Sequence, residues 1–384
     1  MINRRQLFGT GAFGVAGLLT FPRISFARTG GSRRLIFIIQ RGAADGLSIL
    51  APIGDPGLRA QRAALVDEMG PATKLDALFA LHPAMTNVAA LYTSGEALFS
   101  HAVASANRDR SHFDAQNILE TGGAAAYAEK SGWLNRLLTL LPPSEARALA
   151  IAQAVPMALR GSAAVDTYAP SSLPGASPDL MARVTSLYAG DPQLHALWES
   201  ALKTEALTSD LAADNGKNAA ATGALAAKLL LPTDGARVMT IESNGWDTHS
   251  GQKGRLAGQL GGLDTMIGAI SRGLGAAWRD TLIIVATEFG RTVAANGTGG
   301  TDHGTASAAM LIGGSVNGGR VIADWPGLRG SDLFETRDLK PTTQLESLLA
   351  GAIADHYGLD PVRVAQTVYP ALGIKRPVNG LIRA

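Results

Sequence analysis

The stretch RLIFIIQRGAADG, residues 34–46, decides the fold. Five consecutive apolar residues, 35–39, form a run that is typical of a strand buried on both faces of a parallel sheet. The loop that follows is bracketed by Gly42 and Gly46 and presents one carboxylate, Asp45. In open α/β sheets, ligands bind at the carboxyl ends of the strands. The stretch therefore predicts a central strand of an α/β sheet that ends at a candidate site.

Similar runs recur along the chain. Short apolar or β-branched segments bounded by turn residues lie at 97–105, 148–152, 236–242, 281–287 and 308–313. Helical patterns lie at 78–92, 113–120, 179–187 and 255–274, and Thr343-x-x-Glu346 is a capping box that predicts the start of a C-terminal helix. Strands that alternate with helices predict an α/β fold with a mainly parallel sheet sandwiched by helices.

The chain carries no repeat or low-complexity linker that would mark a domain boundary. We therefore expect one α/β domain over residues 28–384. Residues 123–231 hold one weak strand and much alanine-rich helical sequence, notably residues 207–231. This region is predicted either as a lid or helical layer, or as ordinary helical packing.

The N-terminus resembles an export signal. Arg4-Arg5 precede a mildly apolar, glycine-studded run at residues 9–21 and a small-residue exit at Ala27. This is the pattern of a twin-arginine signal peptide over residues 1–27, with the twin-arginine translocase as the partner during export and the periplasm or cell exterior as the destination. The apolar run is shorter than the roughly 20 residues that span a bilayer, so no stable membrane span is expected.

Charge and cysteine content narrow the function. Without the three arginines of the signal, Lys plus Arg falls from 34 to 31 against 32 Asp plus Glu, so nucleic acid loses its main attraction. Cysteine is absent, which excludes disulfides, thiolate metal sites and cysteine nucleophiles. Any metal site must use oxygen and nitrogen ligands.

Polar residues follow nearly every predicted strand. They are Asp45 after the first strand, Arg108, Arg110, Ser111 and His112 after the second, Asp247 and His249 after residues 236–242, and Glu288, Arg291, Asp302 and His303 after residues 281–287. Asp247 and His249 are two residues apart, so in an extended segment their side chains share a face, as ligands of one metal ion would. A turn carboxylate beside a hydrogen-bonded histidine would show the same spacing.

The other residues also have structural alternatives. Asp45 could close an Asx turn, and Glu288 could pair with Arg291. Ser111 could be an N-cap rather than a nucleophile, and His112 could ligate, transfer protons or pack. Arg110, like Arg108, could hold an anion or remain solvated. His82, His101, His195 and His356 lie at positions that favour structural roles.

Five motifs together resemble the exported domain-of-unknown-function 1501 family. They are RGAADGL (41–47), RSHFDAQ (110–116), GWDTH (245–249), EFGR (288–291) and TDHG (301–304). The family is generally placed in the alkaline phosphatase and sulfatase superfamily, so the resemblance implies an alkaline-phosphatase-like fold and hydrolysis of phosphate or sulfate esters.

The resemblance also implies roles for individual residues. Asp45, Asp247, His249, Glu288, Asp302 and His303 would hold divalent metal, with His112 or Asp302 able to complete a site; Ser111 would be the nucleophile, assisted by His112, Arg110 and Arg291. Zinc, manganese or, with fewer histidines, calcium would suit such ligands. The substrate would be a small-molecule or polysaccharide ester.

One departure from the superfamily pattern favours a different function. Glu288 is followed by Phe289, where the superfamily commonly has an aspartate followed by a histidine. Phenylalanine cannot bind a metal ion. The alternative is therefore a catalytically degenerate member of the fold that acts as a periplasmic binding or assembly protein.

Overall fold

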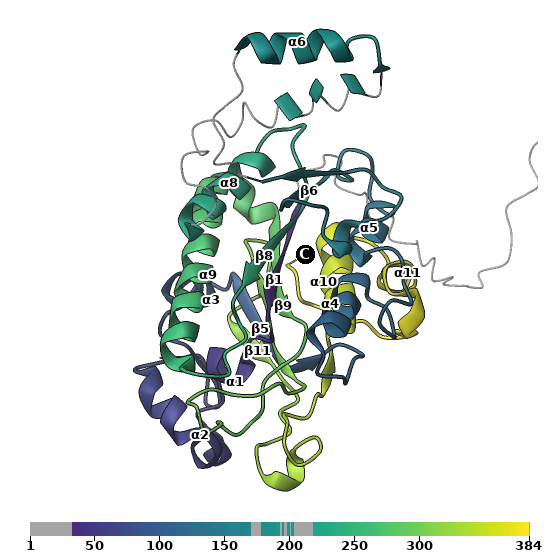
Figure 1. Ribbon diagram of the computed structural model, residues 1–384. Helices are drawn as coiled ribbons and strands as arrows, with labels where there is room; N and C mark the ends of the chain where they lie inside the picture. Colours follow the sequence, from purple (N-terminus) through teal and green to yellow (C-terminus); the bar gives the residue numbers. More distant parts are fainter. Residues whose placement is uncertain are drawn as a thin grey trace, which may run out of the picture. The chain divides into compact units, whose positions relative to one another are not determined.

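A nine-stranded sheet forms the centre of the protein, in the order β11-β5-β10-β9-β1-β8-β6-β7, with β12 paired to β5 (Figure 1). The computed structural model describes residues 33–169, 178–192, 194–195, 198–199, 201–202 and 218–383. The strands are β1 (Arg34–Arg41), β5 (Ala97–Ala104), β6 (Ala148–Ile151), β7 (Val165–Tyr168), β8 (Val238–Asn244), β9 (Thr281–Thr287), β10 (Ser307–Ile312), β11 (Arg320–Ile322) and β12 (Thr343–Gln344). The proposed signal at residues 1–27 lies outside the described residues.

The directions of the strands determine which strand ends lie at the same edge of the sheet. β1 pairs in parallel with β8 and β9, and β6 pairs in parallel with β7 and β8. β10 is antiparallel to both β9 and β5, so β5 runs in the same direction as β9. The carboxyl ends of β1, β5, β8 and β9 therefore share an edge with the beginning of β10.

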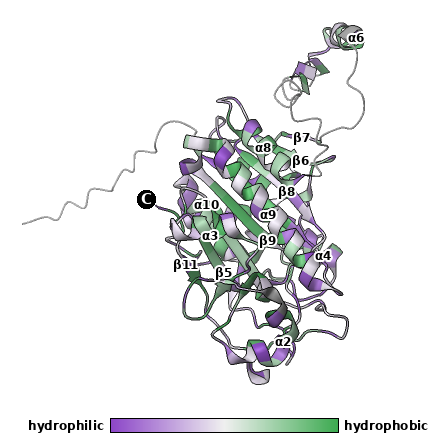
Figure 2. Cartoon of the chain, turned by 90° about the vertical axis from the view of Figure 1, so that its left-hand side faces the viewer, coloured by the Kyte–Doolittle hydropathy of each residue, from purple (hydrophilic) through white to green (hydrophobic). Residues whose placement is uncertain are grey.

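Helices cover both faces of the sheet. α3 (Thr86–Thr93), α8 (Ala219–Leu230) and α9 (Gln252–Leu274) lie on one face, and α4 (His112–Thr121), α5 (Trp133–Leu138), α10 (Leu345–Tyr357) and α11 (Pro361–Val368) lie on the other (Figure 1). β1 faces both layers, because Leu35, Phe37 and Ile39 pack in one core and Ile36 and Ile38 in the other. Figure 2 shows the hydrophobic strands between helices that carry hydrophilic residues. The predicted α/β class and mainly parallel sheet are confirmed.

Smaller elements complete the description. α1 (Gly46–Ile49) and α2 (Pro56–Met69) follow β1, and β2 (Leu50–Ala51), β3 (Thr73–Lys74) and β4 (Ala80–Leu81) form a separate three-stranded sheet. α6 (Pro178–Tyr188) falls in the region predicted as a lid or helical layer, part of which lies outside the described residues. Among the described helices, none is both long and apolar enough to cross a membrane.

Two expected helix starts are corrected. The helix predicted over 78–92 begins only at Thr86, because Ala80–Leu81 pairs with β2 and Pro83 disfavours helical backbone in the residue before it. The capping box at Thr343 does not form. Gln344 is the N-cap of α10 and makes no side-chain capping bond, while Thr343 pairs with β5.

Candidate metal centre

The shared edge of the sheet brings together residues from four separate parts of the sequence. His112 follows β5 at the start of α4, Asp247 and His249 follow β8, and Glu288 follows β9. His303 precedes β10, whose reversed direction brings it to the same edge. Most of the polar residues predicted at the strand ends therefore lie close together; Asp45 is the main exception.

His112, Asp247 and His303 form the group that could hold a metal ion among the described residues, with one candidate ligand atom from each lying within 4.8 Å of the others. His112 Nε2 lies 3.0 Å from His303 Nε2 and 3.7 Å from Asp247 Oδ2. His249 extends the group, because its Nε2 lies 3.0 Å from both His303 Nε2 and Asp247 Oδ1. Three imidazole nitrogens and one carboxylate thus converge.

The opposite ring nitrogens of two of these histidines face carboxylates. His112 Nδ1 lies 2.9 Å from Glu288 Oε1, and His249 Nδ1 lies 3.1 Å from Asp302 Oδ1. Burial works to raise the pKa of Glu288, but the hydrogen bond from His112 holds it below its ordinary value. Hydrogen bonds from Asn296 and His249 lower the pKa of Asp302. Ionised carboxylates only accept hydrogen bonds, so both Nδ1 atoms carry the proton.

His303 has the same arrangement with a different acceptor. Its Nδ1 lies 3.1 Å from the backbone carbonyl of Arg110, which also can only accept. In the neutral form, all three imidazoles therefore present a bare Nε2 lone pair to the same space. His303 Nε2 lies 3.0 Å from each of the other two Nε2 atoms. Lone pairs at this separation cannot hydrogen-bond to one another, whereas a cation placed beside them would be bound by them. An acceptor behind each imidazole is the usual surrounding of metal-bound histidine.

The donor set indicates which metals would fit. Three imidazoles and a carboxylate suit zinc or manganese, whereas calcium prefers six to eight oxygen ligands. Arg291 also contacts the carboxylate, with its Nη1 2.7 Å from Asp247 Oδ1. Burial works to raise the pKa of Asp247, but the hydrogen bond and charge of Arg291 hold it below its ordinary value. Asp247 is therefore ionised in the neutral range.

Glu288 stands behind His112 rather than among the converging nitrogens. Its Oε1 accepts hydrogen bonds from the Gly42 amide at 2.8 Å and from Gln116 at 3.1 Å, in addition to His112. Its side chain is fully buried. Phe289 packs on His112, with ring centroids 5.0 Å apart. Glu288 and Phe289 therefore orient His112. Gln116, which donates to Glu288, was not among the site residues predicted from the sequence.

The structure does not bring Asp45 into this group. Its Oδ2 lies 2.7 Å from Arg62 Nη1, 2.7 Å from Ser48 Oγ and 2.6 Å from Gln252 Nε2, and the ion pair with Arg62 is buried. Arg62 lies at a kink in α2, where its backbone is not helical, and its remaining nitrogens donate to the carbonyls of Thr292 and Val293. Asp45 already has a cation. Arg62 was not among the predicted site residues, because it is one of two arginines in α2 and belongs to no motif.

The residues predicted as catalytic differ in their availability. Ser111 is the N-cap of α4, yet its side chain makes no capping hydrogen bond. Arg110 is paired with Asp338 at 2.7 Å and with Glu335 at 2.6 Å. Arg291 is held by Asp247 and by the Thr301 carbonyl. Ser111 therefore keeps its hydroxyl available, whereas both arginines are committed to contacts within the protein.

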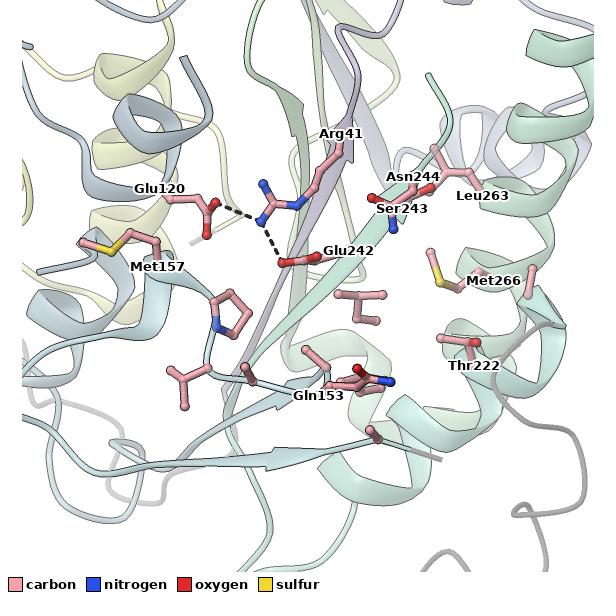
Figure 3. Close-up of a pocket in the computed structure, with 18 of the residues that line it drawn as sticks. Arg41, Glu120, Gln153, Met157, Thr222, Glu242, Ser243, Asn244, Leu263 and Met266 are labelled. Atoms are coloured by element: carbon pink, nitrogen blue, oxygen red, sulfur yellow. Dashed lines mark hydrogen bonds and ion pairs between the residues drawn. The ribbon is translucent and has the colours of Figure 1, made fainter. Parts of the chain in front are cut away.

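A pocket of about 970 Å³ opens at the ends of β1, β6 and β8 (Figure 3). Arg41 lies in it and bonds to Glu120 at 2.8 Å and to Glu242 at 2.6 Å. Arg41 Nη1 also donates to Gln116 at 3.2 Å, and Gln116 donates to Glu288. A chain of hydrogen bonds therefore joins the pocket to the carboxylate behind His112.

The chain was compared with curated proteins, solved structures and protein-family models. A search among curated proteins gave no match. One solved structure, described as "Crystal structure of Ps i-CgsB in complex with k-i-k-neocarrahexaose", is 12% identical, with a TM-score of 0.42 over 85% of this chain and 72% of that chain. The family model described as "Protein of unknown function (DUF1501)" matches residues 32–368, which include every residue of the candidate metal centre. The chain therefore belongs to the DUF1501 family.

Proposed function

We propose that the protein is a metal-dependent hydrolase of phosphate or sulfate esters, built on an alkaline-phosphatase-like arrangement of the sheet. The observation that carries the proposal is the convergence of three histidine Nε2 atoms beside Asp247, with each Nδ1 held by an acceptor. Zinc or manganese bound by His112, His249, His303 and Asp247 would polarise an ester oxygen and increase the acidity of a nearby hydroxyl.

Ser111 supplies the nucleophile in this proposal. It directly precedes His112, and no capping bond engages its side chain. Its place at the start of the ten-residue helix α4 also favours an anionic group, because the first backbone N–H groups of a helix carry partial positive charge. The chain thus offers a hydroxyl and an anion-attracting helix end next to one of the ligands.

Glu288 and Arg291 have supporting roles. Glu288 holds the proton on His112 Nδ1, which keeps the Nε2 lone pair directed at the metal position. Arg291 keeps Asp247 ionised through its 2.7 Å contact. Both residues therefore preserve the charge and orientation of the ligands.

We further propose that the protein works in the periplasm or outside the cell. The twin-arginine pattern at residues 1–27 and the absence of cysteine support export as a folded, disulfide-free chain. An ester-cleaving enzyme in that location would act on small-molecule or polysaccharide esters.

A binding or assembly protein without catalytic activity is the second candidate. The observation that favours it is the Asp45–Arg62 ion pair, because a carboxylate expected to bind metal is instead neutralised by an internal arginine. Phe289, at a position where an imidazole would ligate, points the same way.

Replacement of the serine separates the two candidates. Ser111→Ala is expected to lower hydrolysis of p-nitrophenyl phosphate or p-nitrophenyl sulfate by about a thousandfold or more, because it removes the nucleophile. Ser94→Ala, at an exposed serine that follows α3, is the control and should keep full activity. Metal content should be equal in all three proteins.

Two other outcomes would contradict the serine nucleophile or the hydrolase activity. Retained hydrolysis in Ser111→Ala would show that serine is not the nucleophile. A wild-type protein that holds metal but cleaves neither ester, nor any of a wider panel of phosphate and sulfate esters, would favour the binding protein.

A further inference from the structure

The pocket beside the metal centre has walls from both helical layers and from the sheet. α9 contributes Gln259, Leu263 and Met266, the end of β8 contributes residues 242–244, and the segment after β6 contributes residues 152–157. Figure 3 shows the Arg41 ion pairs at one end of this space and Met266 and Thr222 across from them. The volume of about 970 Å³ is at the upper end of the roughly 300–1,000 Å³ typical of small-molecule sites, so the pocket can take a sizeable organic group.

The charges in the pocket are balanced. Its charged lining residues are Arg41 and Arg160, opposed by Glu120 and Glu242. Arg41 is already bonded to both glutamates, and Glu120 also accepts from the Ala158 amide. An anionic ligand would therefore find no uncommitted cation at Arg41 and would meet the partly exposed Glu242 carboxylate.

Hydroxyl groups fit this lining better than charged groups do. Glu242 uses Oε1 for Arg41, which leaves Oε2 to accept hydrogen bonds from a ligand. Gln153, Asn244 and Gln259 bring amides that can both donate and accept. Met157 and other apolar side chains supply surface for carbon-bound hydrogen atoms. A lining of this kind matches a molecule with many neutral hydroxyl groups on a carbon skeleton.

We propose that this pocket binds the neutral, hydroxyl-rich part of a carbohydrate ester, whose phosphate or sulfate group is placed at the histidines. The assignment rests on the proposed hydrolase function for the ester group, but the binding of the sugar part does not require metal. Asn244, in the pocket lining, ends β8 three residues before Asp247, so the pocket and the metal centre lie at the same end of this strand. The hydrogen bonds from Arg41 through Gln116 to Glu288 also link the pocket to the metal centre.

Two glycines of α9 provide a matched pair of variants. Gly262 lines the pocket, and a Cβ added there would meet only the Cβ of Ala219, at 3.9 Å. Gly258 lies one turn away and is exposed, with no atom within 4 Å of an added Cβ. Gly262→Leu should therefore fill part of the pocket without a backbone clash, whereas Gly258→Leu makes the same change outside it.

The test is binding to an array of neutral oligosaccharides, followed by calorimetry with the best of them. Wild-type protein is expected to bind at least one, both with zinc and after treatment with EDTA. Gly262→Leu should bind it at least tenfold more weakly, and Gly258→Leu should match the wild type. Circular dichroism confirms that both variants are folded.

Failure of this inference is distinct from failure of the hydrolase proposal. Binding of no neutral oligosaccharide, or equal binding by Gly262→Leu and the wild type, would overturn the assignment of the pocket. Sugar binding that is retained in a protein unable to cleave any ester would leave the pocket assignment intact and reject only the hydrolase.

Discussion

Two aspartates at neighbouring strand ends have different surroundings and different roles. Asp45 follows β1 and Asp247 follows β8, and each has an arginine Nη1 at 2.7 Å. The side chain of Asp45 is 1% exposed and is surrounded by Arg62, a hydroxyl and an amide, whereas that of Asp247 is 43% exposed and faces histidines. The same residue type at the same edge is a structural ion pair in one place and a candidate ligand in the other.

This contrast shows what decides the role of a strand-end carboxylate. A buried charge must be paired within the protein, because desolvation makes an unpaired charge very costly. A half-exposed carboxylate beside imidazole lone pairs can accept a cation from solution. The residues around Asp45 and Asp247, rather than the aspartates themselves, therefore determine their different roles.

The largest expected effect comes from breaking the buried pair. Arg62→Met should lower the free energy of unfolding by about 3–5 kcal/mol, because it leaves the Asp45 charge buried without a partner. Urea denaturation measures this change. Arg59→Met is the control, since the Arg59–Asp67 pair has the same 2.7 Å distance but exposed side chains, and it should cost under about 1 kcal/mol.

The double variant sharpens this comparison. Asp45→Asn combined with Arg62→Met should be more stable than Arg62→Met alone, because no buried charge is left unpaired. Equal losses from Arg62→Met and Arg59→Met would contradict the view that Asp45 depends on an internal cation.

A smaller effect is expected on the side of Asp247. Glu288→Gln should weaken zinc binding by about 10- to 100-fold, because His112 loses the anionic acceptor behind Nδ1. Competition with a chromogenic chelator measures the affinity. Asp302→Asn is the companion variant and should have a milder effect, since Asp302 is about half exposed. Undiminished zinc affinity in Glu288→Gln would argue that His112 does not ligate.

A third effect concerns a histidine near Asp45 that cannot bind metal. His101 is fully buried, its Nε2 donates to the Leu50 carbonyl, and its Nδ1 accepts from the Ala102 amide. Burial lowers the pKa of His101 to about 4. The unfolded chain takes up this proton from about pH 6.5 downward while the folded protein does not, so stability falls as the pH drops from about 6.5 to about 4.

The expected size of the pH effect follows from that interval. At pH 5, His101 should account for a loss of about 2 kcal/mol relative to pH 7. Urea denaturation at both pH values, in wild type and His101→Gln, measures it. The variant should be less stable at pH 7 but lose less on acidification, and an unchanged pH dependence would contradict a neutral, buried His101.

Sequence patterns were sufficient to predict six of the nine strands of the central sheet. The six predicted strands correspond to β1, β5, β6, β8, β9 and β10, because buried strands of an α/β protein are continuous apolar runs. β7, β11 and β12 were not predicted, since they are only two to four residues long. Their pairing depends on neighbours that are distant in the sequence.

The candidate site was predicted in part for the same reason. Loops that follow parallel buried strands meet at one edge, so His112, Asp247, His249 and His303 could be grouped because each follows a predicted strand. The distinction between Glu288 and the converging ligands requires the side-chain geometry. Arg62, which pairs with Asp45, lies at a kink in α2, and no local sequence motif predicts this kink.

Metal analysis of the purified protein tests the central claim most directly. After loading with zinc or manganese and removal of the excess, the wild type and Asp45→Asn should each retain one equivalent, whereas the Asp247→Ala/His303→Ala double variant should retain none. A wild type that cannot be loaded would contradict the metal centre. Two equivalents in the wild type, with one lost in Asp45→Asn, would contradict the assignment of Asp45 to a structural ion pair.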